Sequence, residues 1–84
     1  MAAHVRVYTT TVCPYCIRAK ALLKKRGITY EEIDAGDDAT RDWLVQVTGR
    51  KTVPQIFIGE NAIGGFDELA ALDARGELMG MVGA

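Results

Sequence analysis

The sequence has few of the residues on which metal sites and hydrolytic sites are built. It contains 84 residues, with two cysteines, one histidine and two prolines. A structural zinc site takes four ligands, so His4 and the two cysteines do not complete one. Nothing pairs the single histidine with a cysteine, as cysteine-protease chemistry requires. We therefore expect no metal site, and we interpret His4 as a surface residue.

Long hydrophobic runs and an excess of either charge are also absent. The apolar runs are too short for a transmembrane helix, and the first six residues lack the basic-then-apolar order of a signal peptide. The formal net charge of −1 gives no electrostatic reason to expect nucleic acid or a membrane surface as a partner. An apolar content of 49% predicts a folded chain. We expect residues 1–84 to form a single cytoplasmic domain.

The two cysteines stand three positions apart in Cys13-Pro14-Tyr15-Cys16, between a strand-like and a helix-like run. If Pro14 is the first helical residue, Cys13 is the N-cap and Cys16 follows one turn later. That separation allows a disulfide to form and open without unfolding the chain. The helix N-terminus favours a thiolate at Cys13. The motif therefore predicts redox chemistry, with Cys13 as the nucleophile and Cys16 as the resolving thiol.

The remaining pattern predicts alternating strands and helices. We expect strands at 4–8 and 28–33, a hairpin of strands at 55–58 and 61–64, and a helix from Pro14 that ends at Gly27. A second helix follows 36–38 and ends at Gly49, and a third is capped by Asp67 and ends at Gly76. The tail from Glu77 is weakly patterned.

Side-chain periodicity predicts which residues of these helices are buried. In the second helix Trp43, Leu44 and Val47 form the expected buried stripe. In the tail we interpret Met79 and Met81 as residues that fill gaps in the core.

The predicted order, β-α-β-α-β-β-α, is that of an α/β protein with the thioredoxin fold. A parallel βαβ unit followed by a hairpin gives a four-stranded mixed sheet flanked by three helices. The turn that carries Cys13 then lies at the carboxyl end of the first strand, where open α/β sheets form ligand crevices. We therefore expect the cysteines at the mouth of a binding site.

At this level of detail the chain resembles the dithiol glutaredoxins, most closely the short bacterial members. The matching segments are Tyr8-Thr9, Cys13-Pro14-Tyr15-Cys16, Gly49-Arg50, 52–58, 63–67 and 71–76. The resemblance implies a glutathione-dependent thiol-disulfide oxidoreductase that reduces protein disulfides and glutathione mixed disulfides. It also implies that Pro54 is a cis-proline, and that glutathione is bound by Tyr15, Arg41, Thr52, Val53, Pro54, Gly65, Phe66 and Asp67.

One departure from the family pattern concerns the residues before the motif. Many glutaredoxins carry a lysine where this chain has Thr9, Thr10 and Thr11. A threonine offers a hydrogen bond but no positive charge, so Arg41, Lys51 and the helix N-terminus are left to compensate. The residue expected to hold the glycine carboxylate of glutathione is Arg41.

Two other functions stay open. Some glutaredoxins carry a 2Fe–2S cluster between two chains and two glutathiones through the first cysteine, although Pro14 makes that less expected here. The second is a thioredoxin-like reductant that a flavin reductase reduces. The groove residues Tyr15 and Asp67 argue against this function. For the thiol-disulfide oxidoreductase we expect a monomer, glutathione as co-substrate, and disulfide-bonded or glutathionylated proteins as partners.

Overall fold

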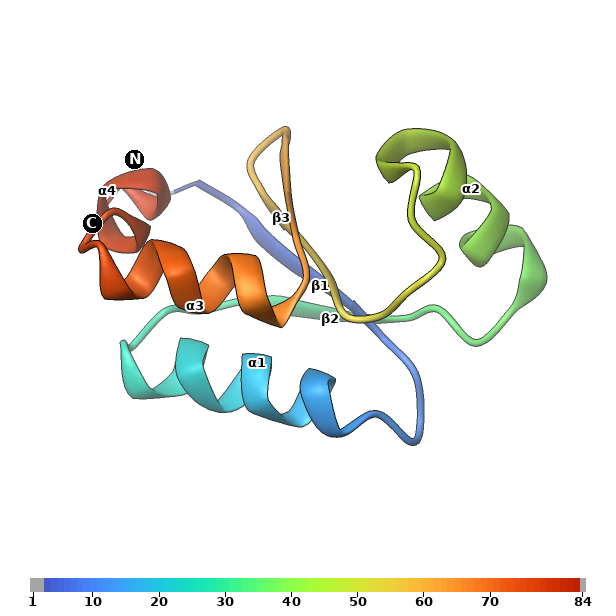
Figure 1. Cartoon of the computed structure of the whole chain (residues 1–84), viewed down its shortest axis with the longest axis horizontal. Helices are drawn as coiled ribbons and strands as arrows, with labels where there is room; N and C mark the ends of the chain where they lie inside the picture. The colour runs from blue at the N-terminus through green and yellow to red at the C-terminus, as the bar shows by residue number, and fades with distance from the viewer. Residues whose placement is uncertain (1–2, 84) are drawn as a thin grey trace.

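The computed structural model describes residues 3–83, which form four strands and four helices (Figure 1). In chain order they are β1 (Val5–Thr9), α1 (Pro14–Lys25), β2 (Glu31–Asp34), α2 (Asp38–Thr48), β3 (Gln55–Ile58), β4 (Asn61–Gly64), α3 (Phe66–Ala74) and α4 (Leu78–Val82). The predicted order is confirmed as far as α3. The additional helix, α4, lies in the tail for which no element was predicted.

The strands make one mixed sheet in the order β2-β1-β3-β4. β1 is parallel to β2, with Val7 opposite Glu32, and antiparallel to β3, with Val7 opposite Ile56. β3 and β4 are antiparallel and are joined at Gly59, whose φ of 62° suits a tight turn. The central position of β3 explains why all four of its residues are buried. The expected mixed sheet is therefore confirmed.

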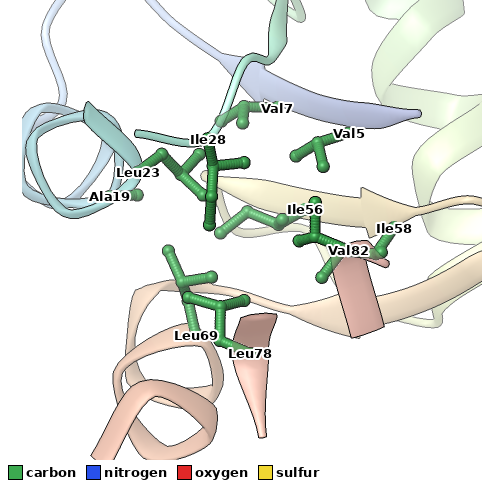
Figure 2. Packing of buried hydrophobic residues seen from close by; sticks show 10 residues of the cluster. All are labelled: Val5, Val7, Ala19, Leu23, Ile28, Ile56, Ile58, Leu69, Leu78 and Val82. Carbon is green, nitrogen blue, oxygen red and sulfur yellow. The ribbon is translucent and has the colours of Figure 1, made fainter. Parts of the chain in front are cut away.

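Alternation along the central strands divides the core between the two faces of the sheet. Val5 and Val7 of β1 point to one face, and Tyr8 contributes to a cluster on the other. The larger cluster fills the space between the sheet and the helices α1, α3 and α4 (Figure 2). It consists of Val5, Val7, Ala19, Leu23, Ile28, Ile56, Ile58, Leu69, Leu78 and Val82. The smaller cluster consists of Tyr8, Ala35, Leu44 and Phe57.

α2 covers its face of the sheet only in part, and this corrects the predicted buried stripe. Leu44 is buried, but Trp43 is 40% exposed and Val47 is 47% exposed. The Trp43 ring packs against the rings of Tyr8 and Phe57, with centroids 5.5 and 5.9 Å away. α1 and α3 lie side by side, whereas α2 stands apart from both of them (Figure 1). Because α2 packs against the sheet and stands apart from α1 and α3, it buries a narrower stripe of side chains than periodicity predicts.

The tail is part of the larger core rather than an unstructured end. Leu78 and Val82 of α4 are buried, and the backbone N–H of Ala3 donates to the carbonyl of Val82 at 2.7 Å. Met81 packs against the core as predicted, but Met79 is exposed. The sheet therefore has four helices around it, not three. None of the helices formed by residues 3–83 combines the length and apolar composition that crossing a bilayer requires.

The second strand is shorter than predicted. β2 begins at Glu31, three residues later than the expected start at Ile28. Ile28 belongs to the end of α1, because its N–H donates to the carbonyl of Leu23 at 2.9 Å. Gly27 ends the helix with a φ of 70°, as its sequence position predicts.

Candidate functional site

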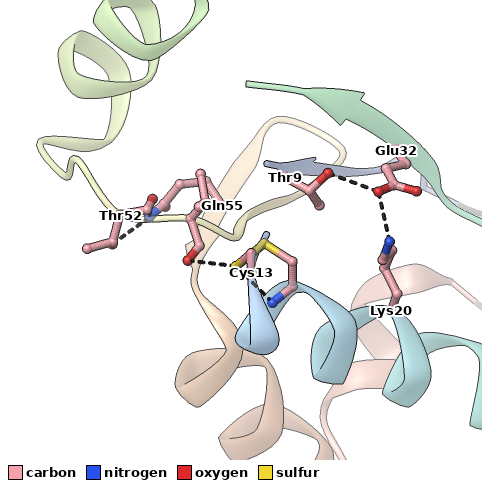
Figure 3. Close-up of a disulfide and its surroundings, with 8 residues drawn as sticks. Thr9, Cys13, Lys20, Glu32, Thr52 and Gln55 are labelled. Carbon is pink, nitrogen blue, oxygen red and sulfur yellow. Dashed lines mark hydrogen bonds and ion pairs between the residues drawn. A yellow bond between two sulfur atoms is a disulfide. The ribbon is translucent and has the colours of Figure 1, made fainter. Parts of the chain in front are cut away.

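The cysteine pair lies at the N-terminus of α1, as the motif predicts. Cys13 is the N-cap, with extended backbone angles, and Pro14 is the first helical residue. Cys13 and Cys16 form a disulfide with their Cα atoms 5.1 Å apart (Figure 3). Both cysteines are buried, Cys13 at 8% exposure and Cys16 at 2%. Cys13 is therefore the more accessible of the two residues, in accord with its predicted role as nucleophile.

The helix end provides the electrostatic environment for a thiolate at Cys13. The backbone N–H of Cys16 donates to Cys13 Sγ at 3.1 Å, and the first turn of α1 carries no acidic residue. A negatively charged sulfur at this position accepts that N–H and lies at the positive end of the helix dipole. The arrangement therefore favours the thiolate of Cys13 once the disulfide is opened.

A loop before β3 faces the cysteines. The peptide bond between Val53 and Pro54 is cis, as the resemblance implies. The carbonyl oxygen of Val53 lies 3.6 Å from Cys13 Sγ. Gln55, which is fully buried, donates from Nε2 to the carbonyl of Thr52 at 2.8 Å (Figure 3). This hydrogen bond fixes the loop, so the backbone of Val53 is presented directly to the reactive sulfur.

A groove of about 280 Å³ runs alongside the disulfide and collects most of the predicted binding residues. Its lining is Tyr15, Arg50, Thr52, Val53, Pro54, Gly65, Phe66, Asp67 and Glu68. The rings of Tyr15 and Phe66 stand 6.4 Å apart between centroids, one from α1 and one from α3. Seven of the eight predicted binding residues therefore converge from three separate segments of the chain.

Arg41 is the predicted binding residue that does not line the groove. It lies in α2, where its Nε donates to the carbonyl of Ala35 at 3.2 Å. α2 packs on the face of the sheet opposite to α3, which explains the separation. Its role in binding stays a prediction.

Asp67 lies at the groove, but its structural role differs from the predicted one. The N-cap of α3 is Gly65, and Asp67 is the second helical residue. Its side chain is exposed, and within residues 3–83 no hydrogen-bond or ion-pair partner holds its carboxylate. Asp67 therefore does not cap the helix, and its charge is available to a ligand in the groove.

Two groove residues, Arg50 and Glu68, were missed by the sequence analysis. Glu68 Oε1 accepts a hydrogen bond from the N–H of Gly65 at 3.0 Å and forms an ion pair with Nη1 of Arg50. The N–H of Gly65 and, secondarily, the guanidinium of Arg50 lower the pKa of Glu68. A glutamate three residues after an N-cap is a recognised capping pattern. That spacing could have identified Glu68 from the sequence. Its partner Arg50 could not be identified in this way, because it is 18 residues away in sequence.

The contact between α3 and the cis-proline loop is close. A Cβ atom at Gly65 would lie 3.3 Å from the carbonyl oxygen of Pro54. At Gly64, where φ is 110°, a Cβ atom would meet the Glu68 carboxylate. Both glycines therefore let the backbone approach the loop and the carboxylate.

The threonines before the motif lie outside the groove. Thr9, Thr10 and Thr11 line a second hollow of about 350 Å³ with Lys20, Glu32 and Asp34. Glu32 accepts hydrogen bonds from Lys20 at 2.8 Å and from Thr9 at 2.9 Å (Figure 3). These two donors, Lys20 first, lower the pKa of Glu32. The charge of Lys20 is therefore compensated by Glu32.

A cysteine pair that forms a disulfide at a helix N-terminus, facing a cis-proline loop on a four-stranded mixed sheet, defines a thiol-disulfide oxidoreductase with the thioredoxin fold. The model of the Glutaredoxin family matches residues 5–63. The chain is 52% identical over 77 residues to Glutaredoxin 3 of Escherichia coli K12, covering 90% of this chain and 93% of that protein. It is 47% identical over 81 residues to a glutaredoxin of Pseudomonas aeruginosa PAO1, covering 95% and 96%.

Solved structures agree with this assignment. A buckwheat glutaredoxin in complex with glutathione superposes with a TM-score of 0.91 at 35% identity, covering 96% of this chain and 77% of that one. The solution structure of a glutaredoxin from Brucella melitensis gives 0.88 at 44% identity, covering 96% and 89%. The chain belongs to the glutaredoxin family. The predicted fold and the predicted glutathione-dependent disulfide oxidoreductase activity are confirmed.

Proposed function

We propose that the groove binds glutathione and that Cys13 exchanges with its sulfur. The backbone of Val53 pairs with the glutathione cysteine as an added strand does, and Tyr15 and Thr52 form the walls. Gly65, Phe66 and Asp67 hold the γ-glutamyl end, with the Asp67 carboxylate facing its ammonium group. The observation that carries the proposal is the convergence of these residues beside Cys13.

The Arg50–Glu68 pair positions the γ-glutamyl subsite without contacting the reacting sulfurs. Glu68 ties the N–H of Gly65 to the guanidinium of Arg50, which follows α2. Because Gly65 precedes Phe66 and Asp67, this connection sets where both side chains lie against the loop. Arg41, on α2, supplies a cation for the glycine carboxylate when glutathione extends past the groove.

Reduction of a glutathionylated protein needs only Cys13. The Cys13 thiolate attacks the glutathione sulfur, a Cys13–glutathione disulfide forms, and the protein leaves as a thiolate. The thiolate of a second glutathione then attacks that disulfide, releasing Cys13 and oxidised glutathione. A sulfur whose thiolate is favoured is also a good leaving group, which speeds the second step.

Reduction of a protein disulfide needs both cysteines. Cys13 attacks one protein sulfur, the other leaves as a thiolate, and a mixed disulfide forms. Cys16, one turn along α1, displaces the protein and closes the Cys13–Cys16 disulfide. Two glutathiones restore the dithiol and leave as oxidised glutathione. We further propose that residues 1–84 act as one monomeric domain in the cytoplasm, with disulfide-bonded and glutathionylated proteins as substrates.

A glutathione-coupled assay on wild type, Cys13→Ser and Cys16→Ser tests these roles. Cys13→Ser loses both activities. Cys16→Ser keeps reduction of a glutathione mixed disulfide and loses dithiol reduction of a protein disulfide. Survival of both activities in Cys16→Ser would refute the assigned roles. Visible colour in protein purified without oxygen would support the iron–sulfur alternative instead.

A further inference from the structure

Tyr15 is a wall of the groove that the core does not hold in place. It is 54% exposed and belongs to neither core cluster. On one side it faces the ring of Phe66 in α3, with the centroids 6.4 Å apart and the planes tilted by 36°. A ring that stands half in water can turn away from the groove unless another group holds it. The shape of the groove therefore depends on the groups that lie against this ring.

Arg18 is the second group that lies against the Tyr15 ring. Its guanidinium carbon is 5.4 Å from the ring centroid, within the range of a cation–π contact. Arg18 follows Tyr15 by three residues in α1, so the two side chains are neighbours on the helix surface. Side chains of a helix lean toward its N-terminus, and the long Arg18 side chain therefore reaches back over the turn that carries Tyr15.

No carboxylate competes with the ring for the guanidinium of Arg18. The ion pairs formed among residues 3–83 do not include Arg18. Two other basic residues of the same helix are paired. Lys20 donates to Glu32 at 2.8 Å, which holds its charge at β2. The C-cap residue Arg26 donates to Asp73 of α3 at 2.7 Å. Arg18 is therefore left to interact with the Tyr15 ring.

We propose that Arg18 is a positioning residue for glutathione, because its guanidinium holds the Tyr15 ring against Phe66 before the substrate arrives. The proposal rests on the proposed binding of glutathione in the groove. Arg18 is not among the residues that line the groove, so it acts through the ring rather than by touching the substrate. A wall that is already in place loses less conformational freedom on binding, and glutathione is bound more tightly as a result.

The test measures kcat and KM for the glutathione mixed disulfide of a small thiol, with glutathione as electron source. The variants are Arg18→Ala, Arg18→Lys, Tyr15→Leu and the double variant Tyr15→Leu/Arg18→Ala. Lys24→Ala is the matched control, because it removes a positive charge from another exposed position of α1. Every variant replaces an exposed side chain with a good helix former, so the fold is retained.

Arg18→Ala is expected to raise KM about two- to fivefold, the factor that an exposed cation–π contact supplies, with a smaller change in kcat. Arg18→Lys, which keeps a cation, restores part of the loss, and Lys24→Ala leaves KM unchanged. Tyr15→Leu also raises KM. In that background Arg18→Ala adds nothing further, because no ring is left for the guanidinium to hold.

Two results overturn the proposal while leaving the groove proposal intact. One is an unchanged KM in Arg18→Ala when Tyr15→Leu raises it. The other is an equal increase from Arg18→Ala with and without the Tyr15 ring, because the charge would then act on the substrate directly. An unchanged KM in Tyr15→Leu overturns the proposed role of Tyr15 as a groove wall, and with it the role of Arg18.

Discussion

Removing the Glu68 carboxylate should weaken both the fold and glutathione binding. Glu68→Ala deletes the acceptor of the Gly65 N–H and the partner of Arg50. The Gly65 N–H lies at the start of α3, and in the variant it loses this capping hydrogen bond and is left without an acceptor. The segment that loses its anchor carries Phe66 and Asp67, so the defect falls on the proposed γ-glutamyl subsite.

The size of the effect follows from the exposure of the two side chains. Losing a helix cap costs about 1 kcal/mol. The ion pair adds little, because the Glu68 side chain is 38% exposed and the Arg50 side chain 46%, so water screens the pair. For a domain of this size, a loss of about 1 kcal/mol lowers the Tm by about 4–8 °C.

Two further variants separate the cap from the charge. Glu68→Gln keeps an oxygen that accepts from Gly65 but loses the ionic contact with Arg50, so it should retain most of the Tm. Glu77→Ala is the control, because Glu77 also pairs with an arginine, Arg75, but lies after α3 and has no capping hydrogen bond.

The assays are thermal unfolding and steady-state turnover of a glutathione mixed disulfide. We expect Glu68→Ala to lower the Tm and raise KM severalfold, with a smaller change in kcat because the sulfurs are untouched. Glu77→Ala should leave KM unchanged. If Glu68→Ala unfolds at the wild-type temperature with an unchanged KM, the anchoring role is wrong.

Three further predictions concern pH, the tail and the threonines. Hydrogen bonds lower the pKa of Glu32 and Glu68 in the folded protein. The two carboxylates therefore stabilise the fold fully above the unfolded pKa of about 4.3, and this contribution is lost as pH falls through the lower folded pKa. Denaturant unfolding should show the free energy of unfolding decreasing as the pH falls below about 4.3, and a flat profile would contradict this. Leu78→Ala should lower the free energy of unfolding by about 2–5 kcal/mol in the same measurement, because Leu78 is fully buried in the larger core. A decrease below about 1 kcal/mol would mean that α4 does not contribute to the larger core. Thr10→Lys should lower KM for a glutathione mixed disulfide by adding a positive charge near the site, and an unchanged or higher KM would contradict that.

Local sequence patterns predicted the elements of the fold that depend on neighbouring residues. The position of Cys13 as N-cap follows from Pro14, and the ends of α1 and α2 follow from Gly27 and Gly49, which both have positive φ. The hairpin turn at Gly59 follows for the same reason. These features were predictable because the backbone conformation of a few residues determines them.

Features that depend on contacts between distant segments were not predictable in this way. Periodicity predicted that Trp43 and Val47 lie on one face of α2, but it could not predict how much of that face the sheet covers. The burial of Leu78 depends on a core completed by β1, β3 and α3, so a five-residue helix left no pattern of its own. The topology predicted a binding site beside the cysteines, but the residues that line the groove were expected only from the family resemblance. Arg50 and Glu68 were missed because they come together only through tertiary structure.

The central claim is that Cys13, and not Cys16, is the sulfur that bonds to glutathione. The direct measurement is mass spectrometry of Cys16→Ser and Cys13→Ser after incubation with oxidised glutathione, followed by peptide mapping. The account predicts one glutathione on Cys16→Ser, attached to Cys13, and none on Cys13→Ser because Cys16 is buried at 2% exposure. A glutathione adduct on Cys16, formed as quickly as the one on Cys13, would contradict the account.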